Sequence, residues 1–130
     1  HRQWKHEGHC AYIHGYSRQY TFHFEAKEMD EHGWVVGFGD LKKLEKYLLE
    51  MYDHTMIIAE DDPELETFQN LHEKGLCDLR VVPEASLESS AKSALNKANE
   101  ILSEMTNGRA RCFKVEAREN DKNSAIYTLE

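Results

Sequence analysis

The chain has 130 residues, 40% of them hydrophobic and 10% aromatic, which suits one domain with a packed core and is too short for two. Sixteen basic and 24 acidic residues give a formal net charge of −8, which argues against a general nucleic-acid-binding protein. No apolar run is long enough to span a membrane, and no secretory signal opens the chain. The three cysteines are widely spaced, which favours a reducing compartment over a set of disulfides. We therefore expect a cytoplasmic protein.

The first half of the chain predicts a hairpin followed by a helix. Alternating apolar and polar residues from Tyr12 to Ala26 predict a long strand with one buried face. A turn at residues 29–33 leads to Trp34 to Phe38, which we expect to be the returning strand. Asp40 is the expected N-cap of a helix from Leu41 to about Tyr52.

The second half predicts two helices and three short strands. A helix is expected from Asp62-Pro63 to Gly75, followed by a strand from Leu79 to Val82. Ser86 should cap a helix that runs to about Met105. Two terminal strands, Ala110 to Ala117 and Ser124 to Leu129, are expected to follow across a polar turn.

This order of elements predicts a single α+β domain over residues 1–130, built on a four-stranded antiparallel sheet with helices on one face. Open edges in so small a sheet favour association with further copies.

The first candidate site lies near the start of the chain, where four of the eight histidines fall within the first fourteen residues. His14 and Tyr16 project from one face of the predicted strand, and Cys10 lies four residues earlier. A neutral imidazole there can bind zinc, although the spacing matches no standard zinc finger and taken alone favours a buried strand histidine at position 14.

Two further groups carry carboxylates. Asp53 and His54 are adjacent, and a carboxylate beside an imidazole fixes its tautomer for acid–base work, although such pairs also arise by chance in turns. Glu119 ends a predicted strand, where a carboxylate can accept two N–H groups from a guanidine-like ring edge or simply be a charged turn residue.

Taken in chain order, these motifs resemble the 6-pyruvoyl- and 6-carboxy-tetrahydropterin synthases, small enzymes of the tunnelling fold. The resemblance covers nearly the whole chain. The matching segments are His1-Arg2, Cys10-Ala-Tyr-Ile-His14-Gly15-Tyr16, Gly33 to Lys42, Tyr52-Asp53-His54, Ser86 to Ala91, and Glu119-Asn120 with Tyr127.

The resemblance implies a zinc-dependent lyase that acts on 7,8-dihydroneopterin triphosphate. The implied zinc ligands are His1 and His14. The implied proton-transfer set is Cys10, Asp53 and His54, and the implied substrate-binding residues are Glu119 and Ser86. The spacing of Cys10 and His14 is closer to the 6-carboxy type, which makes a 7-deazaguanine precursor on the route to queuosine, than to the 6-pyruvoyl type.

The resemblance also implies an assembly and a triphosphate site. Family members form trimers paired into hexamers, so we expect an oligomeric barrel with a small-molecule pterin partner and no nucleic acid or membrane partner. A negatively charged protein that takes a triphosphate needs local positive charge, for which Arg2, Lys5 and Arg18 are candidates.

The main departure from the family pattern is Tyr16, which stands where the family has a third zinc-ligating histidine. A phenol with a pKa near 10 is a poor substitute for imidazole. His9 or His6 could supply the third nitrogen, Tyr16 could bind weakly, or the metal could be lost; we favour His9. Loss of the metal would leave a catalytically silent pterin- or purine-binding relative or, on the histidines alone, a simple metal-binding module.

The chain also departs from the family in length. Residues 60–83 are longer than the family usually has at this point and are predicted to be an inserted helix and strand. The family's first strand would precede His1.

Overall fold

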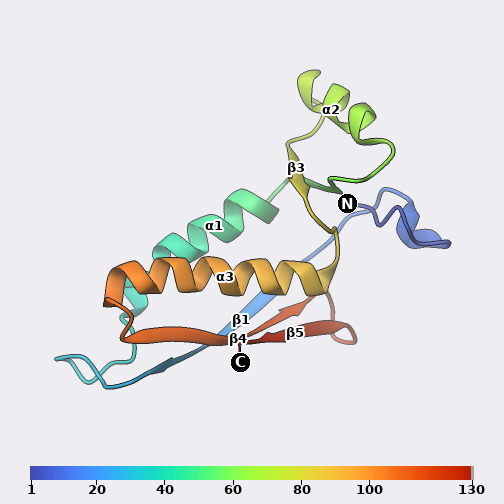
Figure 1. Ribbon diagram of the computed structural model, residues 1–130. Helices are drawn as coiled ribbons and strands as arrows, with labels where there is room; N and C mark the ends of the chain where they lie inside the picture. The colour runs from blue at the N-terminus through green and yellow to red at the C-terminus, as the bar shows by residue number, and fades with distance from the viewer. Residues whose placement is uncertain (130) are drawn as a thin grey trace.

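An antiparallel sheet covered on one face by two helices forms the body of the protein, as the computed structural model of residues 1–129 shows (Figure 1). The strands are β1 (Gln19–Ala26), β4 (Ala110–Arg118) and β5 (Ser124–Thr128), in the order β1-β4-β5. The helices are α1 (Lys42–Tyr52) and α3 (Leu87–Thr106). The predicted α+β architecture with helices on one face is therefore confirmed.

Helix α3 supplies most of the core, and its start agrees with the prediction. The Ser86 hydroxyl accepts the Ser89 N–H at 3.0 Å, which satisfies one of the free donors of the first turn. The helix ends at Asn107, whose left-handed backbone (φ 50°) stops the α conformation. The side chains that face the sheet recur at helical spacing and are buried: Ala91, Ala94, Leu95, Ala98, Ile101 and Leu102.

The prediction of a four-stranded sheet was wrong, because residues 34–37 form a loop instead of a returning strand and Phe38 begins a short 3-10 helix. The Asp30 carboxylate accepts the Trp34 N–H at 2.9 Å, and the Arg109 guanidinium donates to the Val35 carbonyl oxygen at 2.8 Å. Side chains thus bind the backbone groups that a strand would have used. The apolar residues of this region remain partly outside the core, with Trp34 in the loop 52% exposed and Phe38 89% exposed.

Two predicted boundaries also need correction. Strand β1 begins at Gln19, not Tyr12, because β4 ends opposite Gln19, at Arg118, and offers no partner to residues 12–18. Asp40 is not an N-cap: it lies inside the short 3-10 helix η2 (Phe38–Leu41), which leads directly into α1 without a side-chain cap.

Residues 56–82 form a separate small unit beyond the ends of α1 and α3 (Figure 1). Strands β2 (Met56–Ala59) and β3 (Leu79–Val82) pair in parallel and are connected by α2 (Leu65–Glu73). The sequence predicted α2 and β3, with α2 longer than observed, and missed β2. No helix within residues 1–129 is long and apolar enough to cross a membrane.

Candidate functional site

Four of the residues predicted to bind zinc or to transfer protons line one groove of about 620 Å³. His1 and His14 enter it from the segment that precedes β1, and Asp53 and His54 enter it from the turn that follows α1. The fold therefore brings together side chains that lie about forty to fifty positions apart in the sequence.

The two histidine rings lie against each other, with centroids 4.3 Å apart. Main-chain hydrogen bonds run both ways between His1 and His14, at 2.9 and 3.1 Å. His14 Nδ1 lies 2.6 Å from the carbonyl oxygen of Tyr12, which can only accept, so Nδ1 carries the proton and Nε2 is the free acceptor of the neutral ring. His1 is buried, and its Nδ1 has no hydrogen-bond partner in residues 1–129.

Tyr16 connects the segment before β1 to the end of α1. Its hydroxyl lies 2.8 Å from the Tyr52 carbonyl oxygen and 3.0 Å from the Thr55 carbonyl oxygen, either of which can accept its proton. It also lies 2.7 Å from the Thr55 hydroxyl. Burial raises the pKa of Tyr16, so the side chain is a neutral phenol at physiological pH. Sequence reasoning missed this role, since Thr55 belongs to no motif.

Asp53 and His54 form a solvent-exposed pair at the C-terminal end of α1. His54 Nδ1 lies 3.0 Å from Asp53 Oδ1, so the neutral ring donates through Nδ1 and offers Nε2 as a base. The His54 backbone has the left-handed conformation (φ 57°), which turns the chain from α1 towards β2. The arrangement is that of an imidazole base oriented by a carboxylate.

These residues do not fit a zinc site with three protein ligands, which is the usual number at a catalytic zinc. The part of the chain that the structure describes contains no group of three or more His, Cys, Asp or Glu side chains able to hold a metal ion. His9 is exposed on the short 3-10 helix η1 (His9–Ala11) and does not line the groove. His1 and His14 offer two ligands, and zinc binding stays a prediction.

Cys10 also lies on η1, where its thiol is free and half-buried. The Cys10 carbonyl oxygen accepts the Gln3 N–H at 2.8 Å, so the loop folds back on itself. Cys10 does not line the groove that contains His54.

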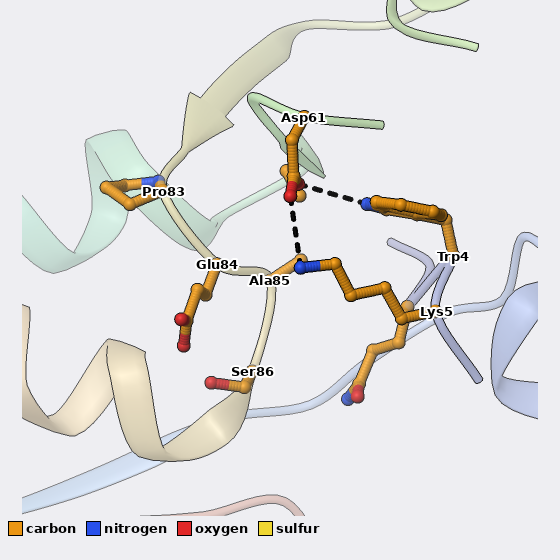
Figure 2. A pocket seen from close by; sticks show the side chains of 9 residues that line it. Trp4, Lys5, Asp61, Pro83, Glu84, Ala85 and Ser86 are labelled. Atoms are coloured by element: carbon orange, nitrogen blue, oxygen red, sulfur yellow. Dashed lines mark hydrogen bonds and ion pairs between the residues drawn. The ribbon is translucent and has the colours of Figure 1, made fainter. Parts of the chain in front are cut away.

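Ser86 lies in a different hollow, of about 270 Å³, between the N-terminal segment and the turn before α3 (Figure 2). Asp61 joins the two sides of this hollow. Its carboxylate accepts the Trp4 indole N–H at 3.0 Å and lies 3.1 Å from the Lys5 ammonium. Because the Ser86 hydroxyl already accepts a backbone N–H of α3, it serves here as a helix cap.

Arg2 forms a bidentate ion pair with Asp62, which lies between β2 and α2. Its Nε and Nη2 donate to the two oxygens of Asp62 at 2.8 and 2.6 Å, and the Asp62 side chain is fully buried. Arg2 lowers the pKa of Asp62, so the carboxylate stays charged. The sequence indicated Asp62 only as the start of a predicted helix, because its pairing with Arg2 depends on the tertiary fold.

Glu119 lies at the turn between β4 and β5, outside the groove. Its carboxylate accepts a hydrogen bond from the Asn123 amide at 3.1 Å. The preceding residue, Arg118, pairs with Gln19 at the start of β1, so the turn lies at the same end of the sheet as the groove.

Comparison with known proteins points to one family. The model of the 6-pyruvoyl tetrahydropterin synthase family matches residues 1–130. Among curated proteins, the 6-carboxy-5,6,7,8-tetrahydropterin synthases of Rickettsia bellii and Rickettsia conorii are 38% and 33% identical over 66 residues, which is 50% of this chain. The match spans about half (48%) of the length of these relatives.

Solved structures show the same fold at low sequence identity. An uncharacterized protein from Wolinella succinogenes superposes with a TM-score of 0.83 at 21% identity, over 99% of this chain and 91% of that one. The 6-pyruvoyl tetrahydropterin synthase of Plasmodium falciparum gives a TM-score of 0.65 at 18% identity, over 94% of this chain and 84% of that one.

Proposed function

Because the chain belongs to the 6-pyruvoyl tetrahydropterin synthase family, we propose that it is a lyase that converts 7,8-dihydroneopterin triphosphate into 6-carboxy-5,6,7,8-tetrahydropterin. The observation that carries this proposal is the groove in which His1, His14, Asp53 and His54 meet. The names of the curated relatives favour the 6-carboxy product over the 6-pyruvoyl product.

In this proposal His54 is the group that moves protons. Either product requires a proton to leave a carbon of the substrate side chain and another to be returned elsewhere. Neutral His54 can accept the first through Nε2, and Asp53, 3.0 Å from Nδ1, stabilises the imidazolium that forms. The groove of about 620 Å³ is within the range of small-molecule sites.

The remaining assignments extend this proposal. Cys10 is proposed as the second proton-transfer group, Glu119 as the residue that anchors the pterin ring and Ser86 as a further substrate contact. Zinc held by His1 and His14, with His9 from the loop, stays a separate proposal, and no step of the reaction described here depends on it. We further propose a trimer or hexamer in the cytoplasm, acting in 7-deazaguanine precursor synthesis.

The test is incubation with 7,8-dihydroneopterin triphosphate and identification of the product by mass. His54→Asn removes the base while keeping a residue that tolerates the left-handed backbone, and it should lower turnover about 10²–10⁴-fold. His32→Asn, at another exposed histidine, should leave turnover unchanged. Cys10→Ala tests the thiol separately. Absence of turnover by zinc-loaded wild type would contradict the lyase proposal.

A catalytically silent pterin-binding protein is the second candidate, and Tyr16 is the observation that favours it. The Tyr16 hydroxyl contacts Tyr52 and Thr55, so the position that the family gives to a metal ligand is used for structure. Saturable binding of 7,8-dihydroneopterin without product formation would favour this candidate.

A further inference from the structure

Arg18 lies beside the candidate site and has no anionic partner within residues 1–129. Arg2 is paired with Asp62 at 2.6 Å and Lys5 with Asp61 at 3.1 Å, so two of the three cations predicted to meet a triphosphate are already neutralised. Within residues 1–129, Arg18 makes no ion pair and donates no hydrogen bond to another residue. Among the three it is the one whose donors remain available.

The guanidinium of Arg18 is held by aromatic rings instead of by a carboxylate. Its central carbon lies 5.1 Å from the Tyr16 ring centroid and 5.2 Å from that of Tyr52. Contacts with ring faces orient the planar guanidinium but do not use its N–H groups, which remain directed outward in the plane. Two or more parallel N–H donors in a fixed plane match the oxygens of a phosphate group.

Arg18 lines a hollow of about 340 Å³ that adjoins the groove. Three residues, Tyr16, Tyr52 and Asp53, line both spaces. Tyr20 lines the hollow as well, and its hydroxyl is buried without a hydrogen-bond partner in the described part of the chain. A ligand in the groove can therefore extend past Tyr16 and Tyr52 towards an unpaired cation and an unsatisfied hydroxyl.

We propose that this hollow is a phosphate subsite in which Arg18 binds the triphosphate arm of the substrate. The inference rests on the proposed function for the identity of the substrate, whereas the subsite itself rests on Arg18 and its surroundings. His54, the proposed base, then lies in the groove, and Arg18, which binds phosphate, lies in the hollow. Tyr16, Tyr52 and Asp53 stand between them. Arg18 binds the arm and takes no part in proton transfer.

The first experiment measures binding of inorganic triphosphate to the full chain by isothermal titration calorimetry. Arg18→Gln should weaken binding about 10- to 100-fold, the usual effect of losing charge-assisted hydrogen bonds. Arg111→Gln is the matched control: it makes the same change of charge at a half-exposed arginine paired with Glu25, and binding should stay at the wild-type value. Arg18→Lys, which keeps the charge but loses the planar fork, should give an intermediate affinity.

The subsite is refuted if wild type shows no saturable binding, if Arg18→Gln binds as tightly as wild type, or if Arg111→Gln loses as much affinity as Arg18→Gln. The second experiment compares substrate kinetics with inhibition by 7,8-dihydroneopterin, which lacks the phosphates. Arg18→Gln should raise KM for the triphosphate substrate and leave the inhibition constant unchanged. If triphosphate binding depends on Arg18 but no turnover occurs, the lyase proposal is refuted and the subsite stands. If turnover occurs and Arg18→Gln leaves KM unchanged, the subsite is refuted and the lyase proposal stands.

Discussion

Replacing Asp62 by asparagine should destabilise the protein far more than the same replacement at the neighbouring Asp61. Asp62 has a fully buried side chain and accepts two hydrogen bonds from Arg2, whose own side chain is only 18% exposed. Asparagine keeps one acceptor for the Glu64 N–H but removes the charge that neutralises Arg2. The Asp61 side chain is 49% exposed and its partner Lys5 is 69% exposed.

The magnitude follows from burial. Loss of one partner of a buried ion pair usually costs about 3–5 kcal/mol, because the other charge is left without compensation. The residual exposure of Arg2 and the retained acceptor reduce the expected cost of Asp62→Asn to slightly below this range, about 2–3 kcal/mol. Asp61→Asn should leave the unfolding midpoint near that of wild type, because water screens an exposed pair.

Urea unfolding followed by circular dichroism measures both variants. Arg2 lowers the pKa of Asp62 from its ordinary value of 3.8, so the stabilisation is complete above pH 3.8 and is lost as the pH falls through the lower folded pKa. The gap between wild type and Asp62→Asn should therefore be constant from pH 7 to pH 5 and shrink below pH 3.8. Equal midpoints for the two variants at pH 7 would refute the assignment of Arg2–Asp62 as a stabilising buried pair.

Two further predictions concern the core and the metal. Asn99→Ala should lower the free energy of unfolding by about 2–4 kcal/mol, because alanine leaves two buried backbone groups unpaired. The Asn99 amide hydrogen-bonds both the N–H and the carbonyl oxygen of Cys112 in the core. Urea unfolding measures this change, and a loss no larger than that of a surface substitution would contradict it. Tyr16→His should raise zinc affinity above that of wild type by adding a third imidazole close to His1, whose ring centroid lies 5.2 Å from that of Tyr16. Metal analysis after dialysis measures this, and unchanged zinc content would contradict zinc binding by His1 and His14 together with position 16.

Local patterns predicted the elements whose partners are close in sequence or whose ends carry a specific cap. Helix α3 was predicted to within one residue at each end, because Ser86 and Asn107 provide end signals and its apolar stripe is long. The predicted strand at residues 34–38 failed because Arg109, about 75 positions away, binds the loop carbonyls. Strand β2 was missed because four consecutive apolar residues, three of them buried, give no periodicity.

The sequence predicted part of the candidate site, namely those motif residues that the fold brings into one groove. His1, His14, Asp53 and His54 line one groove, whereas Cys10, His9, Glu119 and Ser86 lie outside it. The difference between Arg2 and Arg18 was not predictable, because it depends on where Asp62 lies in three dimensions. Charge can be counted from a sequence, but neutralisation of a particular charge is a property of the fold.

The two ends of the segment 60–82 lie side by side, since the Glu60 N–H donates to the Val82 carbonyl oxygen at 2.7 Å. A segment whose ends meet can be gained or lost as a module, with only a short join between Ala59 and Pro83. This module nevertheless carries the carboxylate that neutralises Arg2, next to His1 in the groove. Its removal should leave the contacts among β1, β4, β5 and α3 in place but take away the anion that holds Arg2, so this segment is compact in itself and yet tied to the N-terminal segment beside the groove.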